Sequence, residues 1–303
     1  MKRRNFIQQT AAAGTFIGLG GLNLSFDKSQ TRHITILHTN DVHSHIEPMS
    51  PNDPRNPNMG GIARRATLVE QIRTENPNTL LLDAGDIFQG TPFFNFYGGE
   101  LEFKLMSKLK YDAATIGNHD FDNGIDGLYA QLPHAEFDFI SSNYDFSNTV
   151  MDGKTHPYRI FTKDGVKIGV FGLGIELKGL VNAHHYKETK YLDPIEIATD
   201  MSRTLKQDKK CDIVICLSHL GYEYSSNQVS DIRVAESTSN IDLIIGGHTH
   251  TFLEKPVVVN NKNGKKVMIN QVGCFGLYLG RVDFYLDSQN NVSGDGVRIT
   301  VAP

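Results

Sequence analysis

The sequence predicts an α/β fold in which two packed sheets lie between flanking helices. Short runs of β-branched and aliphatic residues alternate with longer amphipathic segments over residues 33–245. From residue 256 onward the sequence is rich in strand-forming residues, with a turn at residues 261–264. Strand–helix alternation followed by hairpins is typical of a layered α/β domain. No repeat or low-complexity linker divides residues 33–303, so we expect one domain there.

The expected strands are short apolar runs bounded by Gly, Pro, Asn or Asp. Two of these runs are joined by Asp164-Gly165, a dipeptide that favours a tight hairpin turn. The run at residues 213–217 is apolar throughout, as expected for a strand buried on both faces. In chain order, the expected strands are residues 33–39, 79–82, 113–116, 137–140, 158–161, 167–172, 213–217 and 241–245.

The expected helices follow from apolar spacing and from their first residues. After Gly60 and Gly61, apolar side chains recur close to a 3.6-residue period. Pro194 follows Asp193, and proline favours the first position of a helix. In chain order, the expected helices are residues 62–73, 101–109, 125–132, 194–210 and 229–236.

Composition excludes some partners. The net charge is −4 over 303 residues. Without three basic residues near the start, 34 acidic residues face 27 basic ones, a balance of −7. This argues against binding a nucleic-acid polymer or an anionic membrane through bulk charge, but not against a small anionic substrate. The three cysteines form no CxxC motif and are expected to be buried free thiols.

Residues 1–26 are expected to be an export signal. Arg3 and Arg4, one spacer, and then Phe6 and Ile7 resemble a twin-arginine signal. The apolar stretch at residues 11–21 is too short and too rich in glycine to span a membrane. We therefore expect a periplasmic or otherwise exported protein without stable membrane insertion. The alternative is an N-terminus with a chance Arg pair, and no clear cleavage site can be assigned.

Polar side chains of metal-binding type follow five of the expected strands. The stretch at residues 117–122 alone offers an amide, an imidazole and carboxylates. Open α/β sheets place their chemistry at the carboxyl ends of strands. Mixed nitrogen and oxygen ligands, with one Asp available to bridge, suit two divalent cations of the Mn, Fe, Zn or Co type. The residues concerned are Asp41, His43, Asp86, Asn118, His119, His219, His248 and His250.

Two of these groups are pairs separated by two residues. Asp41 precedes His43, and His248 precedes His250, by this spacing. In an extended chain, side chains two residues apart point to the same side. We therefore expect each pair to face the site from an extended segment. His45 could contact Asp41 or His43 and help to orient these ligands without binding the metal itself.

In this order, the motifs Asp-x-His, Gly-Asp, Gly-Asn-His-Asp, Ser-His and Gly-Gly-His-Thr-His resemble the calcineurin-like metallophosphoesterase superfamily. Residues 39–45 and 60–65, with Phe121 and Asp122, are similar to its 5′-nucleotidase and UDP-sugar hydrolase branch. The resemblance covers residues 33 to about 286. It implies a four-layer α-β-β-α sandwich of two mixed sheets flanked by helices.

The resemblance also implies a role for each residue. A metal-bound hydroxide would attack phosphorus, and His119, oriented by Asp122, would stabilise the transition state and assist the leaving group. Asn118 and His119 would contact the substrate. The first metal would be bound by Asp41, His43, Asp86 and His250. The second would be bound by Asp86, Asn118, His219 and His248, with Asp86 bridging.

Members of this branch usually carry a C-terminal domain that binds the nucleoside, and we expect none in these 303 residues. Three interpretations of the enzyme stay open. It could act alone with broad specificity on phosphomonoesters, or work with a separate chain that supplies the C-terminal domain. It could also hydrolyse a 2′,3′-cyclic nucleotide or another phosphodiester. A hydrolase of sulfur-linked groups is not selected by these motifs, and a non-catalytic metal-binding scaffold is disfavoured because His119 and Asp122 are both present.

Overall fold

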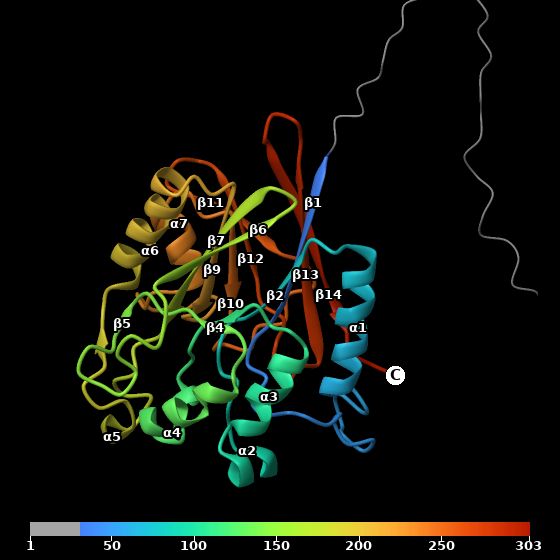
Figure 1. Ribbon diagram of the computed structural model, residues 1–303, viewed down its shortest axis with the longest axis vertical. Coiled ribbons are helices and arrows are strands. Elements are labelled where there is room, and N and C mark those ends of the chain that lie inside the picture. The colour runs from blue at the N-terminus through green and yellow to red at the C-terminus, as the bar shows by residue number, and fades with distance from the viewer. Residues whose placement is uncertain (1–30) are drawn as a thin grey trace, which may run out of the picture. The chain divides into compact units, whose positions relative to one another are not determined.

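Two six-stranded mixed sheets pack face to face, with helices on both outer faces (Figure 1). The computed structural model describes residues 31–303, and the expected export signal lies outside the described residues. The four-layer α-β-β-α prediction is confirmed. Among the described residues, no helix is long and apolar enough to cross a membrane.

The first sheet has the order β14-β13-β1-β2-β3-β4. Strands β1 to β4 run parallel, and β13 pairs antiparallel with both β1 and β14. Its strands are β1 Arg32–Thr39, β2 Thr79–Asp83, β3 Ala113–Ala114, β4 Asp138–Phe139, β13 Tyr278–Leu286 and β14 Val292–Thr300. The helices between its parallel strands are α1 Ile62–Glu75, α2 Pro92–Tyr97, α3 Glu100–Lys108 and α4 Gly124–Gln131.

The second sheet has the order β11-β12-β10-β9-β7-β6, with four parallel strands between two antiparallel edge strands. Its strands are β6 Tyr158–Lys163, β7 Val166–Gly174, β9 Ile213–His219, β10 Leu243–Gly246, β11 Val257–Asn260 and β12 Lys266–Asn270. Its main helices are α6 Pro194–Arg203 and α7 Asp231–Ser237. A small pair, β5 Tyr144–Asp145 with β8 Lys190–Tyr191, lies beside the short helix α5 Ala183–Tyr186.

Alternation along the strands creates the layers. On β1, Ile34 and Ile36 pack in the cluster between the sheets, whereas Leu37 packs in the cluster that includes helices α1 and α3. On β9, Ile215 faces the first sheet, and Cys216 packs in the cluster that includes α6 and α7. Both faces of the central strands are therefore buried, which explains their continuous apolar sequence.

The expected strands and helices are present, with local differences. The run at residues 113–116 forms only the two-residue strand β3. The helix expected to reach residue 210 changes at Thr204 into a π-helical turn, Thr204–Asp208. Helix α2 was not predicted, because its six residues, capped by Thr91, are too few for a periodic pattern. The three cysteines are buried and unpaired, as expected.

Candidate metal centre

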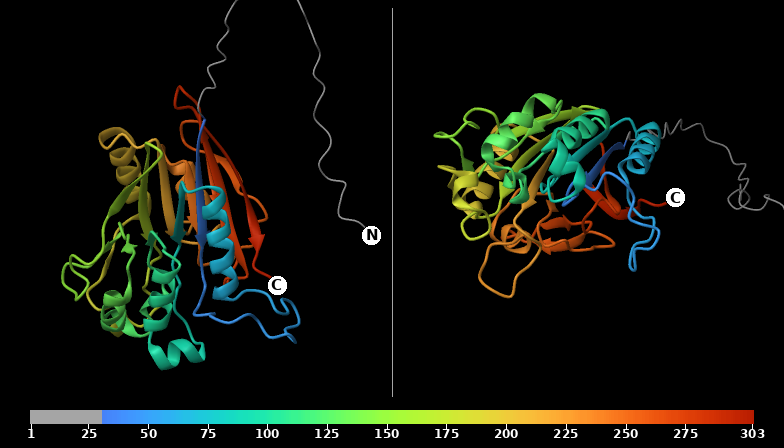
Figure 2. Two further views of the ribbon diagram at one scale, coloured as in Figure 1. Left: turned by 45° about the vertical axis from the view of Figure 1, so that its right-hand side comes forward. Right: turned by 90° about the horizontal axis from the view of Figure 1, so that it is seen from below.

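The expected site residues follow parallel strands of both sheets. Strands β1, β2 and β3 of the first sheet and β9 and β10 of the second carry them at their carboxyl ends. These ends meet at the lower edge in Figure 1, which faces the viewer in the right panel of Figure 2. Because both sheets contribute, residues more than 200 positions apart come together, as the contact between His43 and His250 illustrates.

The chain at this edge is not extended, so our expectation for the paired residues was wrong in its geometry. Asp41 and His43 both have φ 49°, and His248 and His250 have φ 72° and 52°. Asp86 has φ 56° as well. Left-handed backbone is unfavourable for residues with a side chain, and its concentration at five candidate ligands indicates functional strain.

Backbone hydrogen bonds between two loops hold this strained geometry. The amides of Asp41, His43 and Ser44 donate to the carbonyl oxygens of Gly85, Asp86 and Ile87, at 3.0, 3.0 and 2.8 Å. The loop after β1 therefore runs alongside the loop after β2, with Val42 as one extra residue in the first loop. This pairing turns the side chains of both loops toward one point, which the i, i+2 spacing alone does not explain.

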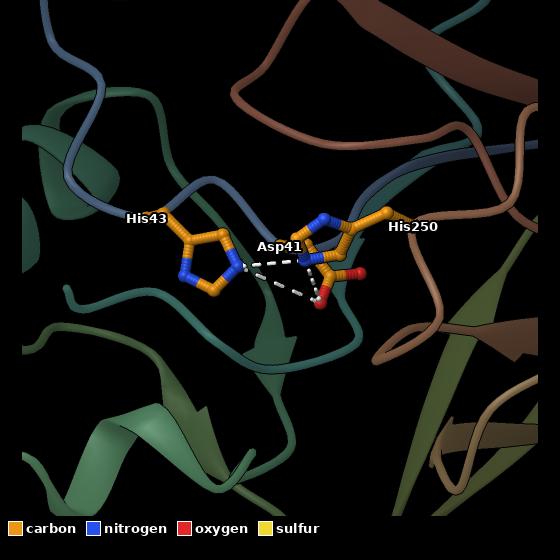
Figure 3. Close-up of side chains that lie close together, drawn as sticks. All are labelled: Asp41, His43 and His250. Atoms are coloured by element: carbon orange, nitrogen blue, oxygen red, sulfur yellow. Dashed lines mark hydrogen bonds and ion pairs between the residues drawn. The ribbon is translucent and has the colours of Figure 1, made fainter.

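The first ligand group consists of Asp41, His43 and His250, whose ligand atoms lie within 4.8 Å of one another (Figure 3). Oδ1 of Asp41 lies 3.4 Å from Nε2 of His250 and 3.9 Å from Nε2 of His43. The two Nε2 atoms are 2.9 Å apart. Asp41 and His43 are fully buried, and His250 is partly exposed at the rim.

The second ligand group consists of Asp86, His219 and His248, within the same limit of 4.8 Å. Nε2 of His219 lies 3.1 Å from Oδ2 of Asp86. The amide oxygen of Asn118 lies 2.8 Å from Nδ1 of His248, which places Asn118 beside this group. His248 and His250 thus belong to different groups, although they are only two residues apart.

Asp86 lies between the two groups. Its Oδ2 is 3.1 Å from Nε2 of His219 in one group and 3.8 Å from Nε2 of His43 in the other. Its second oxygen, Oδ1, accepts a hydrogen bond from the backbone amide of His119 at 2.8 Å. The backbone therefore orients the Asp86 carboxylate through Oδ1, and Oδ2 faces both ligand groups.

The donor atoms fit divalent cations. Nδ1 of His43 and of His219 lie 3.2 and 2.7 Å from the carbonyl oxygens of Phe88 and Ala84, which accept their protons. In the neutral form of each ring, this fixes the tautomer in which Nε2 faces the site and is free to bind a cation, as in known metal sites. Nε2 of His219 is buried and faces Oδ2 of Asp86 at 3.1 Å, but without the geometry of a hydrogen bond. A cation would satisfy it.

The electrostatics of the site favour positive charge. Burial opposes protonation of His219, but the neighbouring carboxylates of Asp86 and Asp41 raise its pKa to about 10. The Asp41 carboxylate and the Cys274 side chain raise the pKa of His250 to about 10. The same negative field would stabilise metal cations, whose binding displaces those protons.

His119 and Asp122 lie beside the two groups. Nδ1 of His119 is 3.0 and 3.1 Å from the two carboxylate oxygens of Asp122. This hydrogen bond, with the charge of Asp86, raises the pKa of His119. The His119 ring meets that of His43 edge-on at 5.3 Å, and Gln89, which we did not predict, contacts the His119 ring at 3.1 Å.

The sequence analysis assigned no role to Asp120, which is fully buried. Its Oδ2 accepts the amides of Asp86 and Gly117 at 3.1 and 2.8 Å, and its Oδ1 those of Ile87 and Phe88 at 2.9 and 3.1 Å. Burial and the neighbouring Asp86 raise the pKa of Asp120 to about 7, while the amide donors oppose this rise. The motif predicts a polar turn, but not that this carboxylate joins two loops.

Phe275 was also missed. Its amide donates to the carbonyl oxygen of Asp41 at 2.7 Å, and its φ is 61°. Its ring packs against that of His45, tilted by 31° with centroids 4.1 Å apart, and lies 6.0 and 6.1 Å from the rings of His43 and His250. His45 also contacts the carbonyl oxygen of His43 at 2.8 Å, so it supports the first group as considered above. No sequence spacing indicates Phe275.

Two adjacent His/Asp groups at the carboxyl edge of a four-layer sandwich define a hydrolase with a candidate dinuclear metal centre. The family model for calcineurin-like phosphoesterases matches residues 34–252. The chain belongs to this family, and it is a metallophosphoesterase related to 5′-nucleotidases.

Curated relatives include a snake venom 5′-nucleotidase from Crotalus adamanteus, 34% identical over 281 residues, and the human 5′-nucleotidase, 34% identical over 293 residues. Each alignment covers 86% of this chain but only 46% and 47% of the relative. The trifunctional nucleotide phosphoesterase YfkN of Bacillus subtilis is 32% identical over 326 residues, or 94% of this chain and 21% of its own length. The chain thus spans about half the length of the snake venom and human relatives.

Solved structures agree. A 5′-nucleotidase precursor from Thermus thermophilus superimposes with a TM-score of 0.81 at 31% identity, covering 90% of this chain and 56% of that chain. The NAD nucleotidase of Haemophilus influenzae gives a TM-score of 0.78 at 28% identity, covering 87% and 49%. Both comparisons support the fold described above.

Proposed function

We propose that this chain hydrolyses phosphate esters of nucleotides in the manner of a 5′-nucleotidase, using two divalent cations. The observation that carries the proposal is the position of Asp86, whose Oδ2 faces both ligand groups while His119 and Asp122 lie next to them. A shared carboxylate between two mixed His/Asp groups would hold two cations close together, which suits two-metal phosphoester hydrolysis.

The first cation would be held by the group of Asp41, His43 and His250, and the second by the group of His219 and His248 together with Asn118. Asp86 would be shared. Imidazole, amide and carboxylate donors suit Mn, Fe, Zn or Co rather than Mg or Ca alone. When bound, two such cations activate water and neutralise the charge on phosphoryl oxygens.

The chain's own groups then orient the substrate and move a proton. Asn118 and His119 lie beside the ligand groups and would contact the phosphoryl group. Asp122 raises the pKa of His119 and so favours the protonated imidazole. This imidazolium would stabilise the charge that develops in the transition state and donate a proton to the leaving oxygen.

The relatives' names support a nucleotide as the ester. The relatives are described as a 5′-nucleotidase, an NAD nucleotidase and a nucleotide phosphoesterase. A 2′,3′-cyclic nucleotide or another phosphodiester is the second candidate, favoured by the trifunctional description of the Bacillus subtilis relative. Binding to a separate chain that carries a C-terminal nucleotidase domain is a further interaction to test.

The test is hydrolysis by the purified chain, with Mn²⁺, of AMP, a UDP-sugar, a 2′,3′-cyclic nucleotide and p-nitrophenyl phosphate in parallel. We expect AMP to have the highest kcat/KM, and His119→Asn to lower kcat with AMP by about two to four decades. Preference for the cyclic nucleotide would select the second candidate. No hydrolysis of any substrate by a metal-loaded chain would contradict the proposal and favour a scaffold.

We further propose that the protein is exported through the twin-arginine pathway. The support is the sequence of residues 3–7 followed by a short apolar stretch. Export of folded protein suits a chain that acquires its cations before it leaves the cytoplasm.

A further inference from the structure

The segment Gly60-Gly61-Ile62-Ala63-Arg64-Arg65 contributes no side chain to the ligand groups, yet it ends in a deeply buried charge. The Arg65 side chain belongs to helix α1 and is 2% exposed. Its Nε has no hydrogen-bond partner among the described residues. A buried guanidinium N–H without a partner is costly, so this group needs an explanation.

Glu102 of helix α3 presents the complementary problem. The residue is 2% exposed, and within residues 31–303 neither Oε1 nor Oε2 has a hydrogen-bond partner. Burial raises the pKa of Glu102, and the nearby Ser44 side chain opposes the rise. An unsatisfied acid and an unsatisfied guanidinium are therefore buried on two neighbouring helices.

Both side chains line one small cavity, of about 10 Å³. This is close to the smallest space that holds a single water molecule. Tyr111 and Asp83 belong to the same wall, and the other five wall residues are apolar. The polar partners that an ordered buried water requires would therefore come from Arg65, Glu102 and these two side chains.

The position of the cavity connects it to the candidate metal centre. Its wall includes Val42, which lies between Asp41 and His43, and Ile87, which follows Asp86. Ile62 and Arg65 of helix α1 and Glu102 and Met106 of helix α3 form another part of the wall. A group bound there would contact both helices directly behind the two ligand-bearing loops.

We propose that this cavity binds one water molecule, which accepts a hydrogen bond from Nε of Arg65 and donates one to the carboxyl group of Glu102. The water joins α1 to α3 and positions the loops that carry Asp41, His43 and Asp86. Arg65 and Glu102 are thus positioning residues, not ligands. The inference does not depend on which ester is hydrolysed, because it rests on buried groups outside the ligand set.

The direct test is a crystal structure of the chain at a resolution that shows ordered water. We expect one water peak within hydrogen-bond distance of Nε of Arg65 and a carboxyl oxygen of Glu102. A direct Arg65–Glu102 hydrogen bond with no water between them, or a cavity without density, would overturn the proposal.

A double-mutant cycle tests the coupling in solution. Arg65→Met and Glu102→Met each leave the other group buried without its partner, so each lowers Tm strongly. The double variant removes both groups, and its Tm should fall by less than the sum of the two single changes. Additive losses would contradict a water-bridged pair. The matched control is Glu100→Gln on the same helix, where the side chain is exposed and paired only with Lys104.

A third readout separates positioning from bulk stability. If Arg65 and Glu102 position the loops that carry the ligands, Glu102→Met should weaken Mn²⁺ binding about 10- to 100-fold in calorimetry. Losses of this size are typical when residues that support metal ligands are replaced. This measurement is made well below the variant's Tm, and Glu100→Gln should bind Mn²⁺ as the wild type does. Wild-type affinity in Glu102→Met would overturn the positioning role.

Discussion

The carboxylate of Asp122 lies 3.0 Å from Nδ1 of His119, and this hydrogen bond turns Nε2 of the imidazole away from Asp122. His119 begins the 3₁₀ turn His119–Phe121, and the backbone amide of Asp122 donates to the carbonyl oxygen of His119. The pair is therefore fixed by one short turn. Because this turn also supplies the amide that binds Asp86, the His119–Asp122 pair and the ligand groups share one rigid support.

Replacing His119 with Asn should lower kcat by about two to four decades, the usual contribution of general acid–base catalysis. Metal content should stay unchanged, because the side chain of His119 belongs to neither ligand group. Steady-state kinetics and elemental analysis of the same sample test both statements. A variant that lost its metals would mean that His119 is a ligand and not a proton donor.

The pH dependence of kcat should report the same pair. The Asp122 hydrogen bond raises the pKa of His119, so the protonated donor is present at low pH and is lost as pH rises through that pKa. Asp122→Asn removes the carboxylate, and the alkaline limb of the kcat profile should move to lower pH. An unmoved limb in the variant would exclude His119 as the titrating donor.

Asp86→Ala should empty or disorder both metal positions, because Oδ2 of Asp86 faces both ligand groups. Elemental analysis after dialysis should therefore give far less than the wild-type metal content. Asp152→Ala, at an exposed loop position, is the matched control and should retain wild-type content. Full occupancy of either position in Asp86→Ala would contradict the bridging role.

Asp120→Ala should lower the free energy of unfolding by about 3 kcal/mol or more, since four backbone amides lose an acceptor and buried donors are costly to leave unpaired. Urea denaturation measures the change. Asp126→Ala removes an exposed carboxylate paired with Lys187 and should cost less than about 1 kcal/mol. Equal effects of the two substitutions would show that the amide contacts of Asp120 do not stabilise the fold.

Asp283 on β13 should make stability depend on pH. Although burial opposes ionisation, hydrogen bonds from Arg281, Thr35 and His33 hold the pKa of Asp283 below its usual value. Because the folded-state pKa is depressed, its stabilisation is present above about pH 4 and is lost as pH falls through the folded value. Asp283→Asn should therefore cost roughly 1–2 kcal/mol at pH 7 and little at about pH 2–3.

Urea unfolding at both pH values measures this difference. Asp164→Asn, in the exposed turn between β6 and β7, is the control, since Asn also tolerates its φ of 48°. A destabilisation of Asp283→Asn that did not shrink in acid would exclude the ionised carboxylate as its cause.

Arg3-Arg4→Lys-Lys should block export if the leader is a twin-arginine signal. The measurement is the amount of protein in the periplasmic fraction relative to the cytoplasmic fraction. Unchanged periplasmic yield would refute the proposed pathway.

The parallel strands were predictable because their sequences are apolar on both faces and each ends in a polar motif. The loop order Asp41, Asp86, Asn118, His219 and His250 could be placed at one sheet edge for the same reason. A two-residue strand such as β3 offers too little pattern to define its bounds. Helix α2 is likewise too short for a helical period to emerge.

The missed parts of the site depend on tertiary contacts. Phe275 lies far from β1 in sequence, and only the fold brings its amide to the carbonyl oxygen of Asp41. Asp120 was visible in its motif, but its four amide partners belong largely to another loop. The left-handed backbone of Asp41 and His43 arises from hydrogen bonds between two loops. It could not be predicted, because the same i, i+2 spacing of the two side chains also occurs in a strand.

The most direct test of the account is a Mn²⁺ titration of metal-free protein, followed by phosphate release from AMP at each step. If two ligand groups share Asp86 and act together, activity should rise mainly with the second equivalent of metal and level off near two per chain. Removal of the metal with a chelator should return the activity to its starting value. Full activity with one equivalent, or none after two equivalents have bound, would contradict a dinuclear phosphoesterase.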